Sequence, residues 1–341
     1  MRHRPLGNTG LQLSEVAFGC GDNAGLMIAG SAQEQAAAVA HAVGLGITYF
    51  DTAAGYGTTQ SETNLGPALK AAKAHPIICT KVEVTPEQTG DVAQAVIDSV
   101  EASLKRLQLD VVDIVEIHNS PVHQRGDTFT GWMPMLMSEY LGPKGALEGL
   151  RKLRDAGKVR FFGLVNERPD VDLARELIAT HEFVLLNVQY NLLNPTAGRV
   201  KPAGLQVDLD NGDVITTAAQ HGVGTAIFSP MARGVLTSSA LRGEDRHPLA
   251  GTGITRNMEA YQRLLERGRK LRFLEVPGKR TIAQAAIQFL LAHPGVTTVL
   301  GGFTALSHID EMVAAIDAPA LTAEEMAAVE QLWATNFGMA A

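Results

Sequence analysis

Short apolar runs, many of them rich in β-branched or aromatic residues, recur along the chain between longer segments with helical periodicity. Runs that stay apolar, instead of alternating with polar residues, are typical of strands buried on both faces. Eight such runs are predicted as strands: EVAFG from Glu15, ITYFD from Ile47, PIICTK from Pro76, VDIVEIH from Val112, VRFFGLV from Val159, FVLLNVQY from Phe183, GTAIFSP from Gly224 and TTVLGG from Thr297.

The segments between these runs carry the spacing and the start signals of amphipathic helices. Between Ala93 and Leu107, apolar residues alternate at spacings of four and three, which places them on one face of a helix. A Ser or Thr followed three residues later by Glu or Gln forms a capping box and predicts a helix start. Such pairs are Ser31 with Glu34, Thr85 with Gln88, Thr281 with Gln284, and Thr322 with Glu325, the last opening a closing helix from about Ala323.

Eight strands that alternate with helices predict an α/β fold, and eight is the number that closes a (β/α)8 TIM barrel. An open doubly wound sheet is the alternative, but its G-x-G-x-x-G fingerprint is missing after the first strand. We expect one domain over 1–341, because α/β barrels reach this length as a single unit. Two long connections, 119–142 and 234–253, are expected at the C-terminal mouth, and such loops are often functional.

Net charge, hydropathy and cysteine content limit which partners and which cellular compartment are expected. The net charge of −7 argues against nucleic acid or an anionic membrane as the main partner, which leaves a small-molecule ligand. No apolar run approaches the ~18 residues of a membrane span, and no signal peptide is evident. Cys20 and Cys79 form no C-x-x-C pair, so free thiols in a reducing compartment, the cytoplasm, are expected.

Ionisable residues stand at the ends of three consecutive predicted strands, where barrel enzymes carry their chemistry. These are Asp51, Lys81 and His118, and Tyr56 follows Asp51 in the next loop. A phenol with a pKa of about 10 is too weak an acid to donate a proton readily at neutral pH, but a neighbouring ammonium lowers that pKa. The group therefore suits a reaction in which a carbonyl carbon accepts hydride while its oxygen needs a proton.

The chain resembles the aldo-keto reductases over nearly its whole length. The resemblance is carried by RPLGNTGLQLSEVAFG, which implies an N-terminal β-hairpin cap before the first barrel strand. It is also carried by GITYFDTAAGYG with SETNLGPAL behind it, by SLKRLQLDVVDIVEIH and by FSPMARGVL. It implies that Asp51, Tyr56, Lys81 and His118 are the catalytic tetrad. Tyr56 would be the acid in reduction and the base in oxidation, Lys81 paired to Asp51 would lower the pKa of Tyr56, and His118 would position the carbonyl.

The same resemblance implies a nicotinamide cofactor, NADP(H) or NAD(H), bound extended at the mouth, and no metal. Asn166 and Gln189 match the residues that bond the carboxamide, and Phe228 matches the aromatic that stacks on the nicotinamide. Further implied contacts are Gly19, Cys20 and Asp51 at the first strand ends, Ser229, Pro230, Met231, Arg233 and Gly234 along the pyrophosphate, and Gly301, Gly302, Phe303, Thr304, His308 and Met312 in the last loop and helix.

Two departures from the family pattern bear on the cofactor. Val165 replaces a common serine, which removes one carboxamide contact. The last loop lacks the arginine of NADPH-preferring relatives, and guanidinium groups are the best partners of a 2′-phosphate. We therefore expect weakened NADP(H) preference and use of NAD(H), unless Arg233 or Arg242 binds the phosphate instead.

The substrate pocket is expected from Tyr56 and His118 together with Asp22, Trp132 and Met133. The apolar residues of 119–142 would form an adaptable wall over it, or else pack on the barrel rim. The favoured function is carbonyl reduction of an aldehyde, ketone or sugar. Oxidation of an aldose or cyclic alcohol by an NAD-dependent dehydrogenase and a non-enzymatic, cofactor-sensing subunit are the alternatives. Substrate identity, physiological direction and oligomeric state are left open.

Overall fold

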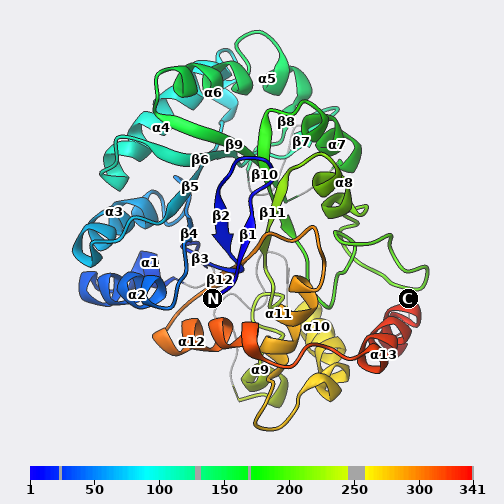
Figure 1. Cartoon of the computed structure of the whole chain (residues 1–341). Helices are drawn as coiled ribbons and strands as arrows, with labels where there is room; N and C mark the ends of the chain where they lie inside the picture. The colour runs from blue at the N-terminus through cyan, green and yellow to red at the C-terminus, as the bar shows by residue number, and fades with distance from the viewer. Residues whose placement is uncertain (23–24, 127–131, 168–169, 245–257, 340–341) are drawn as a thin grey trace.

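The computed structural model describes residues 1–22, 25–126, 132–167, 170–244 and 258–339 (Figure 1). All eight predicted strands form, and they pair in parallel into one closed barrel in chain order, with the last strand against the first. They are β3 (Val16–Gly19), β4 (Tyr49–Asp51), β5 (Ile77–Val82), β6 (Val112–Ile117), β9 (Val159–Asn166), β10 (Phe183–Gln189), β11 (Gly224–Phe228) and β12 (Thr298–Gly302). The (β/α)8 prediction is confirmed, and the doubly wound alternative is wrong.

Helices surround the barrel on its outer side (Figure 1). They are α1 (Leu26–Ala29), α2 (Ala32–Gly44), α3 (Gln60–Ala72), α4 (Val92–Leu107), α5 (Met137–Leu141), α6 (Ala146–Asp155), α7 (Val171–Ala179), α8 (Val214–Gln220), α9 (Ser238–Arg242), α10 (Met258–Lys270), α11 (Ile282–Leu291), α12 (Leu306–Ala314) and α13 (Ala323–Ala334). Short 3-10 turns occupy η1 (Pro86–Gln88), η3 (Arg272–Leu274), η4 (Ala315–Asp317) and η5 (Asn336–Gly338).

Three of the four predicted capping boxes open an α-helix. The boxes at Ser31, Thr281 and Thr322 begin α2, α11 and α13. The box at Thr85 opens only the 3-10 turn η1, so the prediction of an α-helix there is wrong. The amphipathic helix α4 begins later, at Val92. Asp91 caps its start, because its carboxylate accepts a hydrogen bond from the backbone N–H of Gln94.

The interior of the barrel forms its own hydrophobic cluster, distinct from the one between strands and helices. Inward residues such as Tyr49, Ile114 and Leu185 fill it. The N-terminal hairpin, β1 (His3–Pro5) paired antiparallel with β2 (Gln12–Ser14), adds the fully buried Leu6 and Leu13 to this cluster. Figure 1 shows the hairpin lying across one end of the barrel. The predicted hairpin cap is therefore present, and the chemistry is left to the opposite end.

The long connection 119–142 is ordered where the structure describes it. The two-residue strands β7 (Pro121–Val122) and β8 (Met135–Leu136) pair in parallel. The buried side chain of Asn119 fixes the start of the segment, because it accepts a hydrogen bond from Val84 N and donates to Val84 O and Met133 O. The second long connection contributes α9, and its residues 245–253 lie outside the described part.

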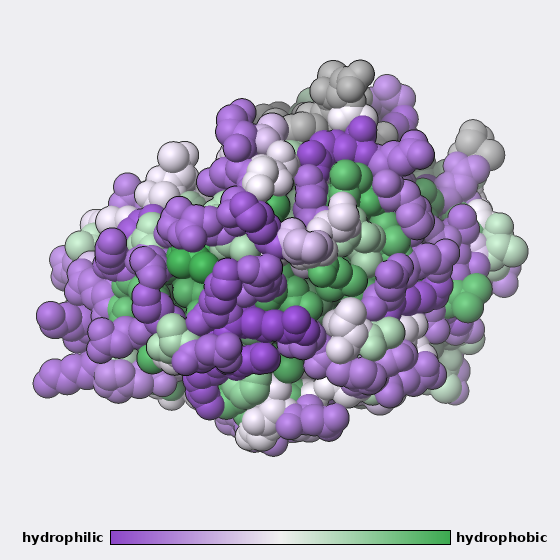
Figure 2. Space-filling view, turned by 90° about the horizontal axis from the view of Figure 1, so that it is seen from above, coloured by the Kyte–Doolittle hydropathy of each residue, from purple (hydrophilic) through white to green (hydrophobic). Residues whose placement is uncertain are grey.

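Hydrophilic side chains cover most of the face shown in Figure 2, with smaller hydrophobic patches exposed between them. In the described ranges, no helix combines the length and the apolar character needed to cross a bilayer. Cys20 and Cys79 are both buried free thiols, as expected.

Candidate active site

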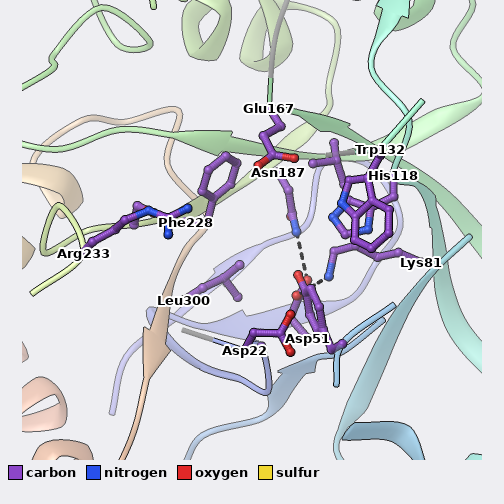
Figure 3. A pocket seen from close by; sticks show the side chains of 14 residues that line it. Asp22, Asp51, Lys81, His118, Trp132, Glu167, Asn187, Phe228, Arg233 and Leu300 are labelled. Atoms are coloured by element: carbon purple, nitrogen blue, oxygen red, sulfur yellow. Dashed lines mark hydrogen bonds and ion pairs between the residues drawn. The ribbon is translucent and has the colours of Figure 1, made fainter. Parts of the chain in front are cut away.

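The four predicted catalytic residues meet at the C-terminal ends of the strands, around a cavity of about 220 Å³ (Figure 3). Asp51 ends β4, Lys81 lies near the end of β5, His118 follows β6, and Tyr56 stands in the loop between β4 and α3. Of the other predicted site residues, Asp22, Trp132, Phe228, Ser229 and Arg233 also line this cavity.

A buried hydrogen-bond network holds the lysine in place. Lys81 Nζ donates to Asp51 Oδ1 and, at 2.8 Å, to the carbonyl of Thr52. The second carboxylate oxygen, Oδ2, accepts from Asn187 Nδ2 at 2.9 Å and from Tyr49 OH at 3.3 Å. Burial opposes a charge on Lys81, but the Asp51 carboxylate together with the other acidic groups around it outweighs burial and holds the pKa of Lys81 well above its ordinary value. Lys81 is therefore a fixed ammonium.

Tyr56 lies beside that ammonium, with Lys81 Nζ 4.8 Å from the centroid of its ring. Burial raises the pKa of Tyr56, and the charge of Lys81 offsets only part of the rise. Lys81 acts in the expected direction by lowering the pKa of Tyr56, but burial has the larger effect. The phenol is thus firmly protonated at neutral pH, which is the state of a proton donor.

His118 sits between two aromatic rings and a carboxylate. Its ring meets Tyr56 edge-to-face at 5.8 Å between centroids and lies 5.1 Å from the ring of Trp132. Its Nδ1 is 2.6 Å from Oε1 of Glu83. The sequence interpretation missed Glu83, although its position two residues after Lys81 is a signal: alternate residues of a strand point the same way.

The opposite side of the cavity carries the amide of Asn187, an aromatic ring and a guanidinium (Figure 3), and Asn166 is buried close to it without lining it. Asn166 is only 1% exposed, and neither atom of its amide, Nδ2 nor Oδ1, has a hydrogen-bond partner among the described residues. Leaving buried polar atoms unpaired is costly, so such a group indicates a ligand. A carboxamide, which both donates and accepts, fits it. Val165 and Glu167, the neighbours of Asn166, line the cavity.

The loop after β11 has an unusual backbone. Ser229, Ala232 and Arg233 adopt left-handed conformations, with φ of 53°, 47° and 57°. Residues with side chains rarely adopt such angles, and they concentrate at functional sites. Arg233 and Phe228 reach the cavity from this loop (Figure 3). Of the other residues predicted here and nearby, Pro230 is buried, and Met231, Gly234 and Gln189 are partly buried.

The last loop divides into exposed and buried positions. Gly302, Thr304 and His308 are exposed, and Thr304 Oγ1 lies 3.0 Å from His308 Nδ1. Phe303 and Met312, in contrast, are buried in the core, where the Phe303 ring packs edge-on against Phe18. Side-chain contacts from these two residues to a cofactor are therefore not available, and only their backbone could take part. At the first strand, Gly19 lets β3 approach Gly301, and Cys20 is buried.

The predicted substrate residues are only partly brought together. Asp22 accepts a hydrogen bond from Gly57 N at 2.6 Å, which ties its loop to the Tyr56 loop. Trp132 is 37% exposed and covers His118. Met133 was expected in the pocket but is 3% exposed and packed in the hydrophobic core, because its carbonyl is anchored by Asn119.

A second buried carboxyl group lies below the site. Atoms of Asp51, Cys79 and Glu116 come within 4.8 Å of one another, which is a spacing that could hold a metal. Lys81 lies among them instead, bonded to Asp51 and 3.9 Å from Glu116 Oε2. Burial raises the pKa of Glu116 well above its ordinary value, partly opposed by Lys81. The donor set is therefore occupied by an ammonium and does not fit a metal.

Comparisons with known proteins show the family to which the chain belongs. The model of the aldo/keto reductase family matches residues 15–334. L-galactose dehydrogenase of Arabidopsis thaliana is 30% identical over 319 residues, covering 92% of this chain and 87% of its own length. L-glyceraldehyde 3-phosphate reductase of Escherichia coli K12 is 28% identical, covering 97% and 92%.

A solved structure is similar over the same extent. The holo form of an aldo-keto reductase from Bacillus halodurans superposes with a TM-score of 0.71 at 25% identity, covering 97% of this chain and 96% of its own. The family match spans nearly all of the barrel and includes every strand that carries a site residue. The chain belongs to the aldo/keto reductase family.

Proposed function

We propose that this protein interconverts a carbonyl compound and the corresponding alcohol, with a nicotinamide cofactor and with Tyr56 as the proton donor in reduction. The observation that supports this most strongly is the placement of Tyr56 against the Lys81–Asp51 ion pair, with His118 at its ring edge, around one cavity.

The opposite side of the cavity fits the cofactor. Bound there, a reduced nicotinamide supplies hydride to a carbonyl carbon, and an oxidised one accepts it. Asn166 would hold the carboxamide through its unpaired amide, Phe228 would flank the ring, and Arg233 would bind the anionic part. The exposed start of α12, which has no side-chain cap, offers further backbone N–H groups to phosphate.

The residues around Tyr56 divide the work of moving one proton. Because burial raises its pKa, Tyr56 holds its proton until negative charge develops on the substrate oxygen. Donation leaves a phenolate, which the Lys81 ammonium stabilises at close range. Asp51 keeps Lys81 charged and fixed, so no reorganisation is needed when the charge appears. In the oxidative direction the same phenolate would accept the proton.

The substrate we propose is a small polyhydroxylated carbonyl compound of the sugar class. Two relatives are named for L-galactose and for L-glyceraldehyde 3-phosphate, and the cavity offers polar partners in Asp22 and Glu167. The name of the first relative, a dehydrogenase, favours oxidation as a second candidate.

We also propose that NAD(H) is used. In the described part of the last loop and helix, Leu306–Ala314 included, the group able to carry positive charge is His308, bonded to Thr304. Arg242 is exposed and paired with Glu244 at 2.6 Å. Arg233 lines the cavity and is the remaining candidate for a phosphate partner.

Fluorescence titration with NADH and NADPH, followed by turnover of aldehydes, ketones and sugars in both directions, tests the proposal. Trp132 stands in the cavity and gives the signal. NADH that binds as tightly as NADPH and supports turnover is the expected result. A preference for NADPH above about a hundredfold, nearly 3 kcal/mol, would reject NAD(H) use. Binding without turnover would favour the cofactor-sensing subunit, and no binding would overturn the proposed function.

A further inference from the structure

One carboxylate of the site has no part in the tetrad. Glu83 follows β5, its side chain is 13% exposed, and its Oε1 lies 2.6 Å from Nδ1 of His118, whose side chain is 6% exposed. At this distance and burial the contact is a strong charge-assisted hydrogen bond instead of a surface ion pair.

The neighbourhood is built to accommodate this contact. A Cβ at Gly55 would lie 2.5 Å from Oε1 of Glu83 and 2.5 Å from Cη2 of Trp132, so only glycine lets both side chains pack over the loop. Trp132 covers one side of the imidazole and Tyr56 meets it edge-on. His118 is thus held from several directions, and its orientation does not depend on a ligand.

An ionised carboxylate accepts hydrogen bonds and cannot donate, so the hydrogen must lie on Nδ1 of His118. A neutral imidazole with its proton on Nδ1 has a lone pair on Nε2, which can only accept. A carbonyl oxygen needs a donor, and Nε2 donates only when the ring is doubly protonated. An alcohol hydroxyl, in contrast, can donate to the neutral ring.

We infer that Glu83 is a positioning residue that fixes the tautomer of His118, so that the neutral ring orients an alcohol and the imidazolium orients a carbonyl. The inference rests on the proposed function for its substrates, but the tautomer itself does not. Because the imidazolium form suits a carbonyl and the neutral form suits an alcohol, reduction should weaken and oxidation strengthen as pH rises.

Other titratable groups share this environment and must be separated from Glu83. Glu83 faces Nδ1 of His118 directly, and Tyr56 is the titratable group at the ring edge. The remaining titratable groups lining the same cavity are Asp22, Asp51, Lys81, Glu167 and Arg233. Glu167 provides the matched control, because Glu167→Gln removes one carboxylate from the cavity without touching the Glu83–His118 pair.

The first experiment measures the tautomer without cofactor or substrate. Nitrogen-15 NMR of the imidazole groups, with the His118 signals assigned by their loss in His118→Gln, distinguishes Nδ1–H from Nε2–H. The wild type and Glu167→Gln should show Nδ1–H when His118 is neutral. In Glu83→Gln the amide can donate to Nδ1, so the Nε2–H form should appear. Glu83→Asp keeps a carboxylate and should keep Nδ1–H.

The second experiment measures kcat/KM in both directions from pH 6 to pH 9. Between pH 6 and pH 9, the reductive kcat/KM of the wild type should fall by more than about tenfold. The reductive kcat/KM of Glu83→Gln should fall by less than about threefold, because the neutral His118 ring of this variant can donate a hydrogen bond. A neutral Nε2–H ring in the wild type, or identical spectra for wild type and Glu83→Gln, would overturn the inference. No turnover by the wild type, with Nδ1–H in the wild type and Nε2–H in Glu83→Gln, would instead reject the proposed function alone.

Discussion

The two sides of the cavity differ in how completely their polar groups are paired. The proton-transfer wall consists of Asp51, Tyr56, Lys81 and His118. The amide wall consists of Asn187, Phe228 and Arg233, together with Asn166, which is buried next to the lining residues and does not itself line the cavity. On the first, both oxygens of the Asp51 carboxylate accept hydrogen bonds, and the Lys81 ammonium donates two. On the second, both amide atoms of Asn166 and Oδ1 of Asn187 have no hydrogen-bond partner in the described ranges.

This difference indicates which wall is stabilised by protein groups alone and which wall is suited to bind a ligand. The proton-transfer wall is organised by its own charges, and it needs no ligand to hold its geometry. The amide wall contains buried polar atoms whose cost a ligand would relieve. The comparison therefore predicts that substitutions on the first wall change the chemical step and that substitutions on the second change cofactor affinity.

The largest effect is expected from Tyr56→Phe, which removes the proton donor and keeps the ring. Reductive kcat/KM should fall by about 10²–10⁴-fold, the usual contribution of a positioned general acid. The dissociation constants of NADH and NADPH should stay within about threefold of wild type, because the amide wall is unchanged. Steady-state kinetics and fluorescence titration measure the two quantities separately.

Tyr190→Phe is the control for loss of a phenol, because Tyr190 is buried against Phe289 and His293 and does not line the cavity. It should retain wild-type turnover. Retention of more than about a tenth of the activity by Tyr56→Phe would mean that another group donates the proton, and the comparison of the walls would fail.

A smaller effect, on cofactor affinity instead of on the chemical step, is expected from Asn166→Leu. Losing two hydrogen bonds to the cofactor should weaken binding by about 1–3 kcal/mol, or roughly 5–150-fold. The free energy of unfolding of the cofactor-free protein should not fall, because the amide that is removed has no partner to leave behind. Titration with NADH and urea denaturation are the measurements.

Asn119 offers the matched control, since it is as buried as Asn166 but makes three hydrogen bonds. Asn119→Leu should lower the free energy of unfolding by several kcal/mol, on the order of 1–3 for each stranded backbone partner. If both variants lower the free energy of unfolding equally, the Asn166 amide is not unpaired in solution, and the contrast between the two walls is wrong.

The last effect is on stability alone and concerns Glu116, the carboxyl group beneath the proton-transfer wall. Its pKa is raised in the folded protein, so it keeps a proton that the unfolded chain releases above the ordinary value of 4.5. The folded state then binds more protons than the unfolded one, and the free energy of unfolding falls as pH rises until the folded pKa is reached.

Glu116→Gln removes this dependence. Relative to wild type it should gain up to about 1.4 kcal/mol of stability per pH unit above that value. Urea denaturation between pH 5 and pH 8 measures the difference, and Glu266→Gln, at an exposed position, is the control. A difference that stays constant over this range would mean that Glu116 is ionised in the folded protein.

Much of the fold could be predicted from the sequence because its signals are local. Each barrel strand is a predominantly apolar run, and each ends within two residues of its predicted boundary. The prediction of an α-helix after Thr85 was wrong because a single 3-10 turn satisfies the same capping hydrogen bonds. The residues after Pro86 and Glu87 do not extend that turn into an α-helix. Only the position of the next buried face, in α4, decides where the helix begins.

The site was predictable where strand order alone brings residues together, as for Lys81 and His118. It was not predictable where side-chain direction decides. Phe303 was placed beside the cofactor by its position in the last loop, but its ring enters the core against Phe18. Glu83 acts through a contact to the residue after the neighbouring strand, and Asn187 acts through a contact to Asp51 across the barrel. A single sequence does not show these contacts.

The pairing of β12 with β3 has a consequence for synthesis. These neighbours are Thr298–Gly302 and Val16–Gly19, so nearly the whole chain separates them. At roughly 5–20 residues per second, β3 leaves the ribosome about 15–60 s before its partner exists. Until then Leu6 and Leu13 cannot be enclosed in a finished barrel. During this time the exposed apolar edge of the nascent chain can bind to other unfolded chains. Slowed translation should therefore lower the yield of folded enzyme, and by more than the refolding yield of the complete chain indicates.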